Sequence, residues 1–191
     1  MSKGKSEHRG VRNTKQKLHE GLLSLMRLKP IQEITVKELT ELTDMNRGTF
    51  YFHYTDIYDL LREMEEAFFR DFSETLQKEP RFQPGSYPYL SAVFSFLGEN
   101  RSFCQIMLGP NGDMLFVEQV KKLVDERCSH FWRAAALDAD PARFEMYNAF
   151  IINGCIGLFQ KWLDNPESSS PEDIAELAAT IILSSVQSAI T

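Results

Sequence analysis

The segment Thr35–Tyr54, TVKELTELTDMNRGTFYFHY, restricts the fold of this chain more than any other part of its sequence. Thr35 is followed three residues later by Glu38, a capping box that predicts the start of a helix. Leu39 and Leu42 are expected to face the interior from this helix. The segment therefore opens with a helix that has one apolar side.

A tight turn and a second helix follow. Asp44 is placed in the turn, where a left-handed backbone is often needed and Asp is tolerated. Asn46 can cap the next helix, which runs to about His53. Two short helices joined by such a turn are typical of a helix-turn-helix motif.

The second helix has a distinctive surface. Phe50 and Tyr54 are four residues apart and are expected to face inward together with Met45. The residues left on or near the exposed side are Arg47, Gly48, Thr49, Tyr51, Phe52 and His53. Three exposed rings in succession would be unusual in solvent, so we interpret this helix as one that lies in the major groove of double-stranded DNA. An ordinary helical hairpin with a few exposed aromatic residues is the alternative.

The side chains on this surface fit contacts with DNA. Arg47 can bind guanine or clamp a phosphate, and the methyl group of Thr49 can contact a thymine methyl. Tyr51 and His53 can donate hydrogen bonds to phosphate. Gly48 costs about 1 kcal/mol relative to Ala inside a helix, which suggests that DNA approaches the backbone closely there.

Charge is distributed unevenly along the chain. Residues 1–29 hold eight Lys and Arg against two acidic residues, whereas residues 30–191 hold 13 against 25. A basic end is thus attached to an acidic body, as expected when one end meets phosphate, although a solvated basic tail is a common alternative. We expect residues 1–11 to form a flexible basic arm whose Arg9, together with the adjacent Arg12, contacts DNA.

Residues 12–62 resemble the DNA-binding domain of the TetR family of transcriptional regulators. The resemblance rests on Ile34-Thr35-Val36, Glu41-Leu42, the run Asn46-Arg47-Gly48-Thr49-Phe50-Tyr51-Phe52-His53-Tyr54, and Leu60-Leu61. The run RGTFYFHY at this distance from ITV is highly specific. The body resembles one C-terminal subfamily of these regulators through Leu108–Gly112 and Gly154–Leu163, so the resemblance extends over nearly the whole chain.

The resemblance implies a role for each matching residue of the head. Thr35 would hold a phosphate at a helix N-terminus, and Lys37 stands where some members place a base-contacting residue. Tyr51 would contact phosphate, and Asn46 begins the DNA-contacting helix. The residues that would reach base edges or the DNA backbone are Arg47, Gly48, Thr49, Phe52 and His53.

Two positions depart from the family pattern. The turn glycine common in the family is Asp44 here, which sets a negative charge near DNA. The basic residue usual near the start of the fourth helix is Ile57, so one phosphate contact is missing. The basic arm can compensate for both changes.

Helical periodicity continues through the rest of the chain, and no segment shows sustained alternation with a period of two. We therefore predict an all-α fold of about nine helices. A cluster of Pro and Gly after residue 79 interrupts the pattern. The predicted domains are a helix-turn-helix head over residues 12–56, a linking helix to about residue 78, and a ligand-binding and dimerisation domain over residues 79–191.

Aromatic and sulfur-containing residues are frequent in the body. As in members of the family, they can line an apolar pocket for a small-molecule effector, although an ordinary core is the alternative for each of them. The candidates are Phe68, Phe72, Phe94, Phe96, Phe103, Met107, Phe116, Phe131, Trp132, Phe144, Met146 and Tyr147.

The last two helices carry small and apolar residues on one face. Gly154 and Gly157 remove side chains where another helix can approach closely. The family resemblance implies that these helices pair with their twins in a homodimer, whereas packing within the chain is the alternative. The expected interface consists of Phe150, Gly154, Gly157, Ile174, Leu177, Ile181 and Ser185.

Other classes of function find no support in the sequence. Cys104, Cys128 and Cys155 are widely spaced without a CxxC pattern, which indicates reduced thiols in a cytoplasmic protein. Cys128 and His130 diverge by about 200° on a helix, so no metal site is expected. No phosphate-binding loop, triad order or carboxylate pair stands out, so we expect neither an enzyme nor a cofactor. No apolar run reaches the roughly 18 residues that span a bilayer, so no membrane contact is expected.

The sequence as a whole predicts a homodimeric regulator whose head binds a palindromic DNA operator. The expected form is a repressor that a small-molecule inducer releases from DNA. Two alternatives stay open. One is a transcriptional activator or partner-dependent regulator of the same fold, and the other is a helical interaction module with a vestigial DNA-binding head.

Overall fold

The computed structural model describes residues 3–78, 87–135 and 141–190, without the side chains of residues 3–9, 87, 127–135, 141–144 and 185–190. These residues form nine α-helices and two 3-10 helices, and no strand lies among them, which confirms the all-α prediction. The α-helices are α1 (Lys3–Met26), α2 (Val36–Leu42), α3 (Arg47–His53), α4 (Ile57–Lys78), α5 (Tyr87–Glu99), α6 (Arg101–Met107), α7 (Met114–Ala135), α8 (Pro141–Leu163) and α9 (Pro171–Ile190). The 3-10 helices are Ile31–Glu33 and Pro166–Ser168.

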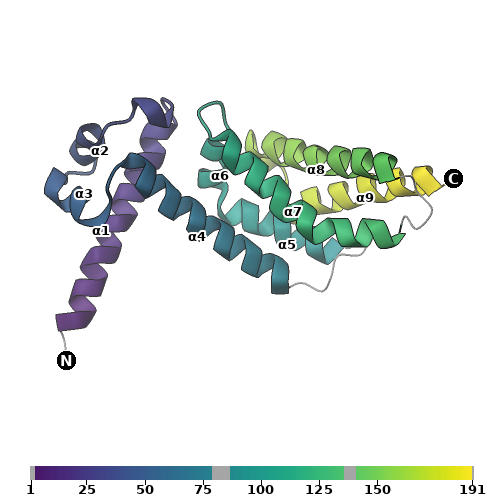
Figure 1. The fold of residues 1–191 in the computed structure, drawn as a ribbon, viewed down its shortest axis with the longest axis horizontal. Helices are drawn as coiled ribbons and strands as arrows, with labels where there is room; N and C mark the ends of the chain where they lie inside the picture. Colours follow the sequence, from purple (N-terminus) through teal and green to yellow (C-terminus); the bar gives the residue numbers. More distant parts are fainter. Residues whose placement is uncertain (1–2, 79–86, 136–140, 191) are drawn as a thin grey trace.

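Figure 1 shows two groups of helices joined by one long helix. α1, α2 and α3 form a head, and α4 runs from this head along the body. α5 to α9 form the body, in which α9 packs against both α5 and α8, and α8 packs against α7. The C-terminus lies at the end of the body farthest from the head.

The head has a core to which each of its helices contributes. Leu18 and Leu22 of α1, Leu39 of α2, Phe50 of α3 and Leu60 of α4 have no exposed surface. Phe50 and Tyr54 are both buried, which confirms the predicted inward side of α3. Burial of one side of each helix leaves the opposite side in solvent.

The turn between α2 and α3 has the geometry that its sequence predicts. Thr35 Oγ1 accepts a hydrogen bond from the backbone N–H of Glu38 at 3.2 Å, and Asn46 Oδ1 accepts one from the backbone N–H of Thr49 at 2.7 Å. Asp44 has a φ of 53°, the left-handed conformation expected for this turn. Local hydrogen bonds therefore set where both helices begin.

Two details of the head differ from the sequence prediction. Leu42 is 53% exposed rather than interior, because α2 ends at this residue. α1 begins at Lys3, whereas the sequence predicts a flexible arm over residues 1–11. The segment contains no Pro, and each residue added to an existing helix gains a hydrogen bond, so the helix of the head extends into it.

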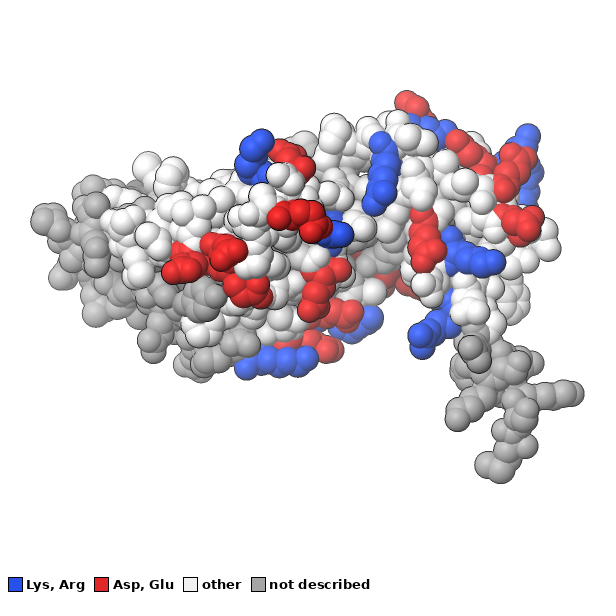
Figure 2. Space-filling model, turned by 180° about the vertical axis from the view of Figure 1, so that it is seen from behind, with Lys and Arg blue, Asp and Glu red and all other residues white. Residues whose placement is uncertain are grey.

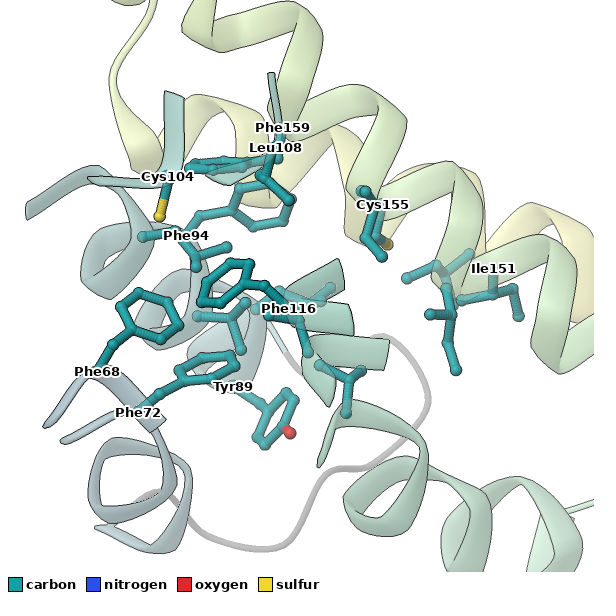
Figure 3. Close-up of a pocket in the computed structure, with 18 of the residues that line it drawn as sticks. Phe68, Phe72, Tyr89, Phe94, Cys104, Leu108, Phe116, Ile151, Cys155 and Phe159 are labelled. Carbon is teal, nitrogen blue, oxygen red and sulfur yellow. The ribbon is translucent and has the colours of Figure 1, made fainter. Parts of the chain in front are cut away.

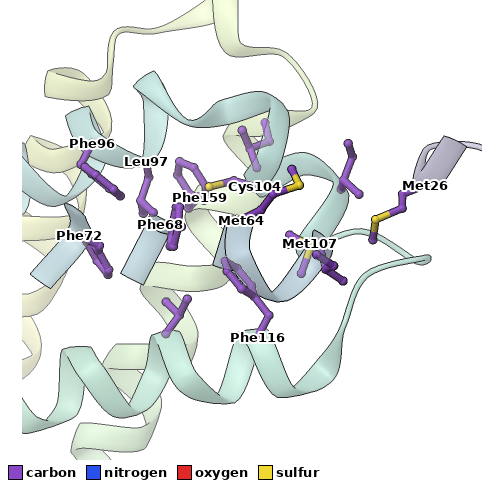
Figure 4. Packing of buried hydrophobic residues seen from close by; sticks show 14 of the residues in the cluster. Met26, Met64, Phe68, Phe72, Phe96, Leu97, Cys104, Met107, Phe116 and Phe159 are labelled. Carbon is purple, nitrogen blue, oxygen red and sulfur yellow. The ribbon is translucent and has the colours of Figure 1, made fainter. Parts of the chain in front are cut away.

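α4 carries one continuous apolar stripe from the head into the body. Its buried residues are Ile57, Leu60, Leu61, Met64, Phe68, Phe72 and Leu76. Figure 4 shows the body half of this stripe packed among side chains of the neighbouring helices. The ring of Phe68 lies 5.3 Å from that of Phe96 on α5 and 5.2 Å from that of Phe116 on α7, measured between centroids. One helix thus belongs to both cores.

The turn between α6 and α7 brings the body into contact with the head. Asn111 Nδ2 donates a hydrogen bond to the backbone carbonyl of Met26, the last residue of α1, at 3.3 Å. A Cβ at Gly112 would lie 2.1 Å from the carbonyl oxygen of Met107, so glycine is needed for this close backbone approach. The turn is therefore a second link between head and body, beside α4.

Replacement of Asp44 tests the left-handed turn. Asp44→Gly is expected to raise the free energy of unfolding by up to about 1 kcal/mol, because glycine adopts a positive φ without steric strain. Asp44→Ala is expected to lower it by a similar amount, since Ala lacks the short polar side chain that tolerates this conformation. Urea unfolding followed by circular dichroism measures both. Equal stability of all three proteins would contradict the assigned turn.

Candidate nucleic-acid interface and effector cavity

The outer face of α3 consists of side chains that the core of the head does not use. Phe52 is 81% exposed and Tyr51 is 58% exposed. A Cβ at Gly48 would meet only Asn46 Oδ1, at 3.1 Å, so the backbone here is open to an incoming molecule. The other exposed or half-exposed residues of the face are Arg47, Thr49 and His53. All six residues assigned to the outer face from the sequence lie on it.

Contacts within the face orient some of these side chains. Asn46 Oδ1 accepts a second hydrogen bond from the hydroxyl of Thr49, at 3.1 Å. The rings of Phe52 and His53 meet edge to face, with centroids 5.0 Å apart. Arg47 takes part in none of the ion pairs found among the described residues. Its guanidinium group is therefore available to an anionic partner.

A polar cluster behind α3 fixes the end of this helix against α1 and α4. The hydroxyl of Tyr54 donates a hydrogen bond to Glu63 Oε1 at 2.8 Å, and Lys15 Nζ lies 2.5 Å from Glu63 Oε2. His19 Nε2 lies 3.3 Å from the Tyr54 oxygen. Burial acts to raise the pKa of Glu63, but hydrogen bonds from Lys15 and Tyr54 outweigh it and lower that pKa. Burial also lowers the pKa of His19 and, with the hydrogen bond to Glu63, raises that of Tyr54 well above its usual range.

Two lysines of the head are paired with carboxylates of the same head. Lys37 Nζ lies 3.8 Å from Glu41 Oε1, and Lys29 Nζ lies 2.7 Å from Glu38 Oε2. The hydrogen bond from Lys29 lowers the pKa of Glu38. Lys37 is exposed on α2, so its ammonium group is accessible to a phosphate beside Glu41. Thr35 is exposed at the start of the same helix.

The structure gives a physical reason for one of the two departures from the family pattern. Ile57 is 4% exposed and belongs to the core of the head, so this position cannot present a charge. Close by, Asp59 Oδ2 accepts a hydrogen bond from the backbone N–H of Thr55 at 2.9 Å, and Asp59 Oδ1 lies 2.6 Å from Arg62. These two interactions lower the pKa of Asp59. Asp44, the other departure, is exposed.

Charge on the surface is mixed rather than uniform. On the face shown in Figure 2, acidic residues are spread across the body, and Lys and Arg stand beside acidic residues on the head. Arg12 is exposed on α1, whereas the side chain of Arg9 lies outside the described residues. The described head therefore shows no broad basic patch on this face.

The body encloses an apolar cavity of about 70 Å³. Figure 3 shows the rings of Phe68 and Phe72 of α4 and Phe116 of α7 on one side of it, with Ile151 and Cys155 of α8 on the other. The residues that line it are Phe68, Phe72, Tyr89, Leu90, Val93, Phe94, Leu97, Cys104, Leu108, Phe116, Val120, Val124, Asn148, Ile151, Ile152, Cys155, Ile156, Phe159 and Ile182.

The lining includes some of the residues proposed from the sequence and leaves out others. Phe68, Phe72, Phe94 and Phe116 line the cavity. The proposed residues that pack in or against the core without lining it are Phe96, Phe103 and Met107. Met146 and Tyr147, at 72% and 37% exposed, lie on the outer side of α8, and the side chains of Phe131, Trp132 and Phe144 lie outside the described residues. Aromatic character alone does not say which side of a helix faces the cavity.

Sequence reasoning missed Asn148, the one amide side chain among the described residues of the lining. Its Nδ2 donates a hydrogen bond to Asp125 Oδ1 of α7. Its Oδ1 is buried and has no hydrogen-bond partner among the described residues. A polar residue within the otherwise apolar stretch before Ile151 is the only sequence signal that could have indicated it.

The two described cysteines also line the cavity, and both are free thiols. Burial raises the pKa of Cys104 to about 12 and that of Cys155 to about 11. Because the thiolate is the reactive form, both groups are unreactive near neutral pH. The side chain of Cys128 lies outside the described residues.

An apolar face along α8 and α9 is left in solvent. Phe150 is 65% exposed, Leu177 47% and Ile181 46%. A Cβ at Gly154 or Gly157 would meet nothing within 4 Å, so this side of α8 is open to another helix.

Among the described residues, no helix combines the length and the apolar character that crossing a membrane requires.

One residue that the sequence places on this face belongs to the interior instead. Ile174 is only 9% exposed, because it shares its side of α9 with Ala178 and Ile182, which are buried in the body. The exposed stripe begins one turn later. The side chain of Ser185 lies outside the described residues.

A carboxyl group lies where α4 meets the start of α7. Glu65 Oε1 is buried and has no hydrogen-bond partner among the described residues. Burial, followed by the charge of Asp113, raises the pKa of Glu65 to about 7. Asp113 itself caps α7, because its Oδ1 accepts a hydrogen bond from the backbone N–H of Leu115 at 2.8 Å. Glu65 therefore titrates near neutral pH.

Comparison with known proteins gives matches to one group of regulators. The family model TetR_C_8, a transcriptional regulator C-terminal region, matches residues 86–184. The uncharacterized HTH-type transcriptional regulator YxbF of Bacillus subtilis (strain 168) is 26% identical over 167 residues. That match covers 82% of this chain and 41% of the relative, so the chain spans less than half of the relative's length.

Solved structures share the fold at low sequence identity. A TetR transcriptional regulator from Streptococcus agalactiae 2603V has a TM-score of 0.65 and 19% identity, over 94% of this chain and 98% of that one. The fatty acid degradation regulator FadR from Bacillus halodurans has a TM-score of 0.66 and 11% identity, over 89% and 94%. The dihydroxyacetone kinase operon activator DhaS has a TM-score of 0.57 and 16% identity, over 91% and 96%. These structures establish the arrangement of helices.

The shifted pKa of Glu65 predicts a pH-dependent stability. The pKa of Glu65 in the folded protein, about 7, lies above its ordinary value of 4.5. Glu65 therefore contributes fully to the free energy of unfolding below about pH 4.5, and this contribution is lost as the pH rises through 7. Glu65→Gln stays neutral, so it is expected to exceed the native protein in stability by roughly 1 kcal/mol at pH 8.5, a figure reduced for partial solvent exposure, and by much less near pH 5. Thermal unfolding at both pH values measures the difference.

Glu66→Gln is the matched control, because Glu66 is exposed on the same helix. It is expected to show no such change with pH. An advantage of Glu65→Gln that is equal at pH 5 and pH 8.5 would contradict the assignment.

Proposed function

The chain belongs to the TetR family of transcriptional regulators, and on this premise we propose that its head binds a DNA operator through the outer face of α3. The observation that carries the proposal is the exposure of Phe52 and Tyr51, 81% and 58%, on a helix whose opposite side is fixed in a core. Exposed rings of this kind are unfavourable in water and gain contact area against base edges and sugars. A DNA groove offers polar and apolar contacts together, so it can cover this face.

Each residue of the face has a role that its position allows. Arg47, outside the ion pairs of the described residues, binds guanine or a phosphate. Gly48 leaves room for the DNA backbone beside α3. Tyr51 and His53 donate to phosphate, and Phe52 contacts the apolar edges of bases. α2 approaches the same groove with the exposed Thr35 and Lys37 at its start.

A homodimer through α8 and α9 is the second part of the proposal. The apolar residues Phe150 and Leu177 of this face are 65% and 47% exposed, and a Cβ at Gly154 or Gly157 of α8 would meet nothing within 4 Å, so another helix can pack closely there. A twofold axis there would present two copies of α3 to successive half-sites, so the operator would be palindromic.

The third part is control by a small molecule in the body cavity. Phe68 and Phe72 line the cavity and also belong to α4, which enters the core of the head. A ligand acts as an inducer if it binds the state whose heads no longer fit the operator more tightly than the DNA-bound state. The protein would then be a repressor that the ligand releases.

A second candidate is activation of transcription, alone or with a partner. DhaS, which shares the fold, is described as an operon activator. In the chain described here, Lys29 and Lys37 are paired with carboxylates of the head, which favours weak DNA binding unaided. Reporter expression from a promoter that contains an operator selected from randomised DNA distinguishes repression from activation.

Arg47→Ala tests the DNA-binding face. An operator recovered by selection from randomised DNA is expected to bind this variant at least about tenfold more weakly, because one charged contact to base or phosphate is lost. Gel-shift titration at fixed salt measures the change. Arg70→Ala, which removes an exposed arginine from α4, is the control and is expected to bind like the native protein. Unchanged affinity of Arg47→Ala would remove the central assignment.

Phe150→Asp tests the dimer. A carboxylate at a position that is 65% exposed in the single chain leaves the fold intact but cannot be buried in an apolar interface without a large desolvation penalty. At micromolar concentration the native protein is expected to sediment as a dimer and the variant as a monomer. Met114→Asp, at an apolar residue that is 79% exposed on α7, serves as the control and is expected to remain dimeric. A native protein that sediments as a monomer would overturn this part of the proposal.

A further inference from the structure

The wall of the body cavity contains one amide in a setting of carbon and sulfur. Most of the described lining is aliphatic, aromatic or thiol, and Asn148 of α8 stands among these groups. In such apolar surroundings a hydrogen bond that forms is more stabilising than in water, and one that is missing is more costly. The orientation of this amide therefore indicates what the cavity can accept.

Asp125 determines that orientation. Its Oδ1 accepts the hydrogen bond from Asn148 Nδ2. An ionised carboxylate can only accept hydrogen bonds, so the amide must turn its NH₂ group toward Asp125 and its carbonyl oxygen away. The reverse orientation would place two acceptors against each other. The carboxylate of Asp125 thus fixes which end of the amide faces it.

The carbonyl oxygen of Asn148 is left without a partner. It has almost no solvent-accessible surface and no hydrogen-bond donor among the described residues. A buried acceptor of this kind is unfavourable until a donor reaches it. A ligand that supplies one donor would satisfy the side chain, whereas a ligand with acceptors alone would not.

The rest of the wall favours a flat ring. Aromatic side chains line the cavity from four helices, namely Phe68, Phe72, Tyr89, Phe94, Phe116 and Phe159. Rings pack against rings in offset or edge-to-face arrangements. The cavity of about 70 Å³ is smaller than the roughly 150 Å³ cavity that holds benzene in an engineered protein, so only a small ring fits with modest movement of the walls.

We propose that this cavity binds a small, uncharged aromatic molecule with a hydroxyl group, and that Asn148 Oδ1 accepts a hydrogen bond from this hydroxyl while Asp125 holds the amide in place. The inference rests on the proposed effector site and names its ligand class. Aromatic carboxylates without a hydroxyl group, such as benzoate, are excluded, because they bring a second negative charge toward Asp125 and no donor for Asn148.

Phenol, toluene and benzoate test the proposal on the full-length native protein. Phenol and toluene have the same number of heavy atoms, but only phenol can donate a hydrogen bond. Isothermal titration calorimetry is expected to show that phenol binds and benzoate does not. In Asn148→Leu, a variant of similar side-chain volume, the ratio of phenol to toluene affinity is expected to fall by about tenfold.

Asn153→Leu is the matched control, since it makes the same change at an exposed residue of α8. Its ratio is expected to equal that of the native protein. An unchanged ratio in Asn148→Leu, or benzoate binding as tightly as phenol, would overturn the proposal.

A second measurement needs no variant at position 148. The side-chain carbonyl carbon of Asn148 is expected to move further downfield with phenol than with toluene, because both rings add a ring-current shift but only phenol donates a hydrogen bond to the carbonyl oxygen. If Asn148→Leu fails to fold, the absence of this larger shift with phenol overturns the proposal by itself. Gel shifts with phenol separate ligand binding from control of DNA binding. If phenol binds as described but leaves operator affinity unchanged, the ligand class is sustained and control by this cavity is refuted.

Discussion

The buried stripe of α4 is the interaction on which both halves of the molecule depend. Leu60 in the head and Phe72 in the body have no exposed surface, and twelve residues of one unbroken helix, about 18 Å, separate them. Because both cores are close-packed, α4 cannot shift in one of them without disturbing the other. The hydrogen bond from Asn111 to the end of α1 adds a second connection. Head and body are thus mechanically coupled by packing rather than joined by a loose linker.

The ion pairs within the head limit how tightly it can hold DNA. Lys15, Lys29 and Lys37 each lie within 4 Å of a carboxylate of the head, at Glu63, Glu38 and Glu41 respectively. Half-exposed pairs of this kind contribute little to stability. A phosphate that recruits one of these lysines also leaves a carboxylate behind near DNA, so part of the attraction is cancelled. The net affinity then depends on the cations outside such pairs, and on the contacts that the apolar face of α3 makes.

What the sequence predicts correctly here is mostly local. Asn46 caps α3 and Asp44 adopts the left-handed turn because their hydrogen bonds and sterics involve residues only a few positions away. Ile174 was misplaced because its burial depends on which distant helix covers that side of α9, and Leu42 because α2 ends there; periodicity contains neither piece of information. Asn148 was missed for the same reason: its importance arises only when α7 brings a carboxylate opposite it. Family resemblance helped with the head, where residues match one by one, and less with the cavity.

The size of the cavity bears on how a ligand can act. A space of about 70 Å³ in a close-packed interior cannot take a ring unless a wall moves. Its walls are not equivalent: Phe68 and Phe72 belong to the helix that enters the head, while Asn148 and Ile151 belong to α8, which also carries the exposed Phe150. Movement of the first wall would shift the helix that enters the head, and movement of the second would change the face through which two chains would pair. In a dimer built on α8 and α9, both movements would alter the spacing of the two α3 helices. A hydrogen bond to Asn148 would anchor the ligand on the second wall, so that its ring presses on the first.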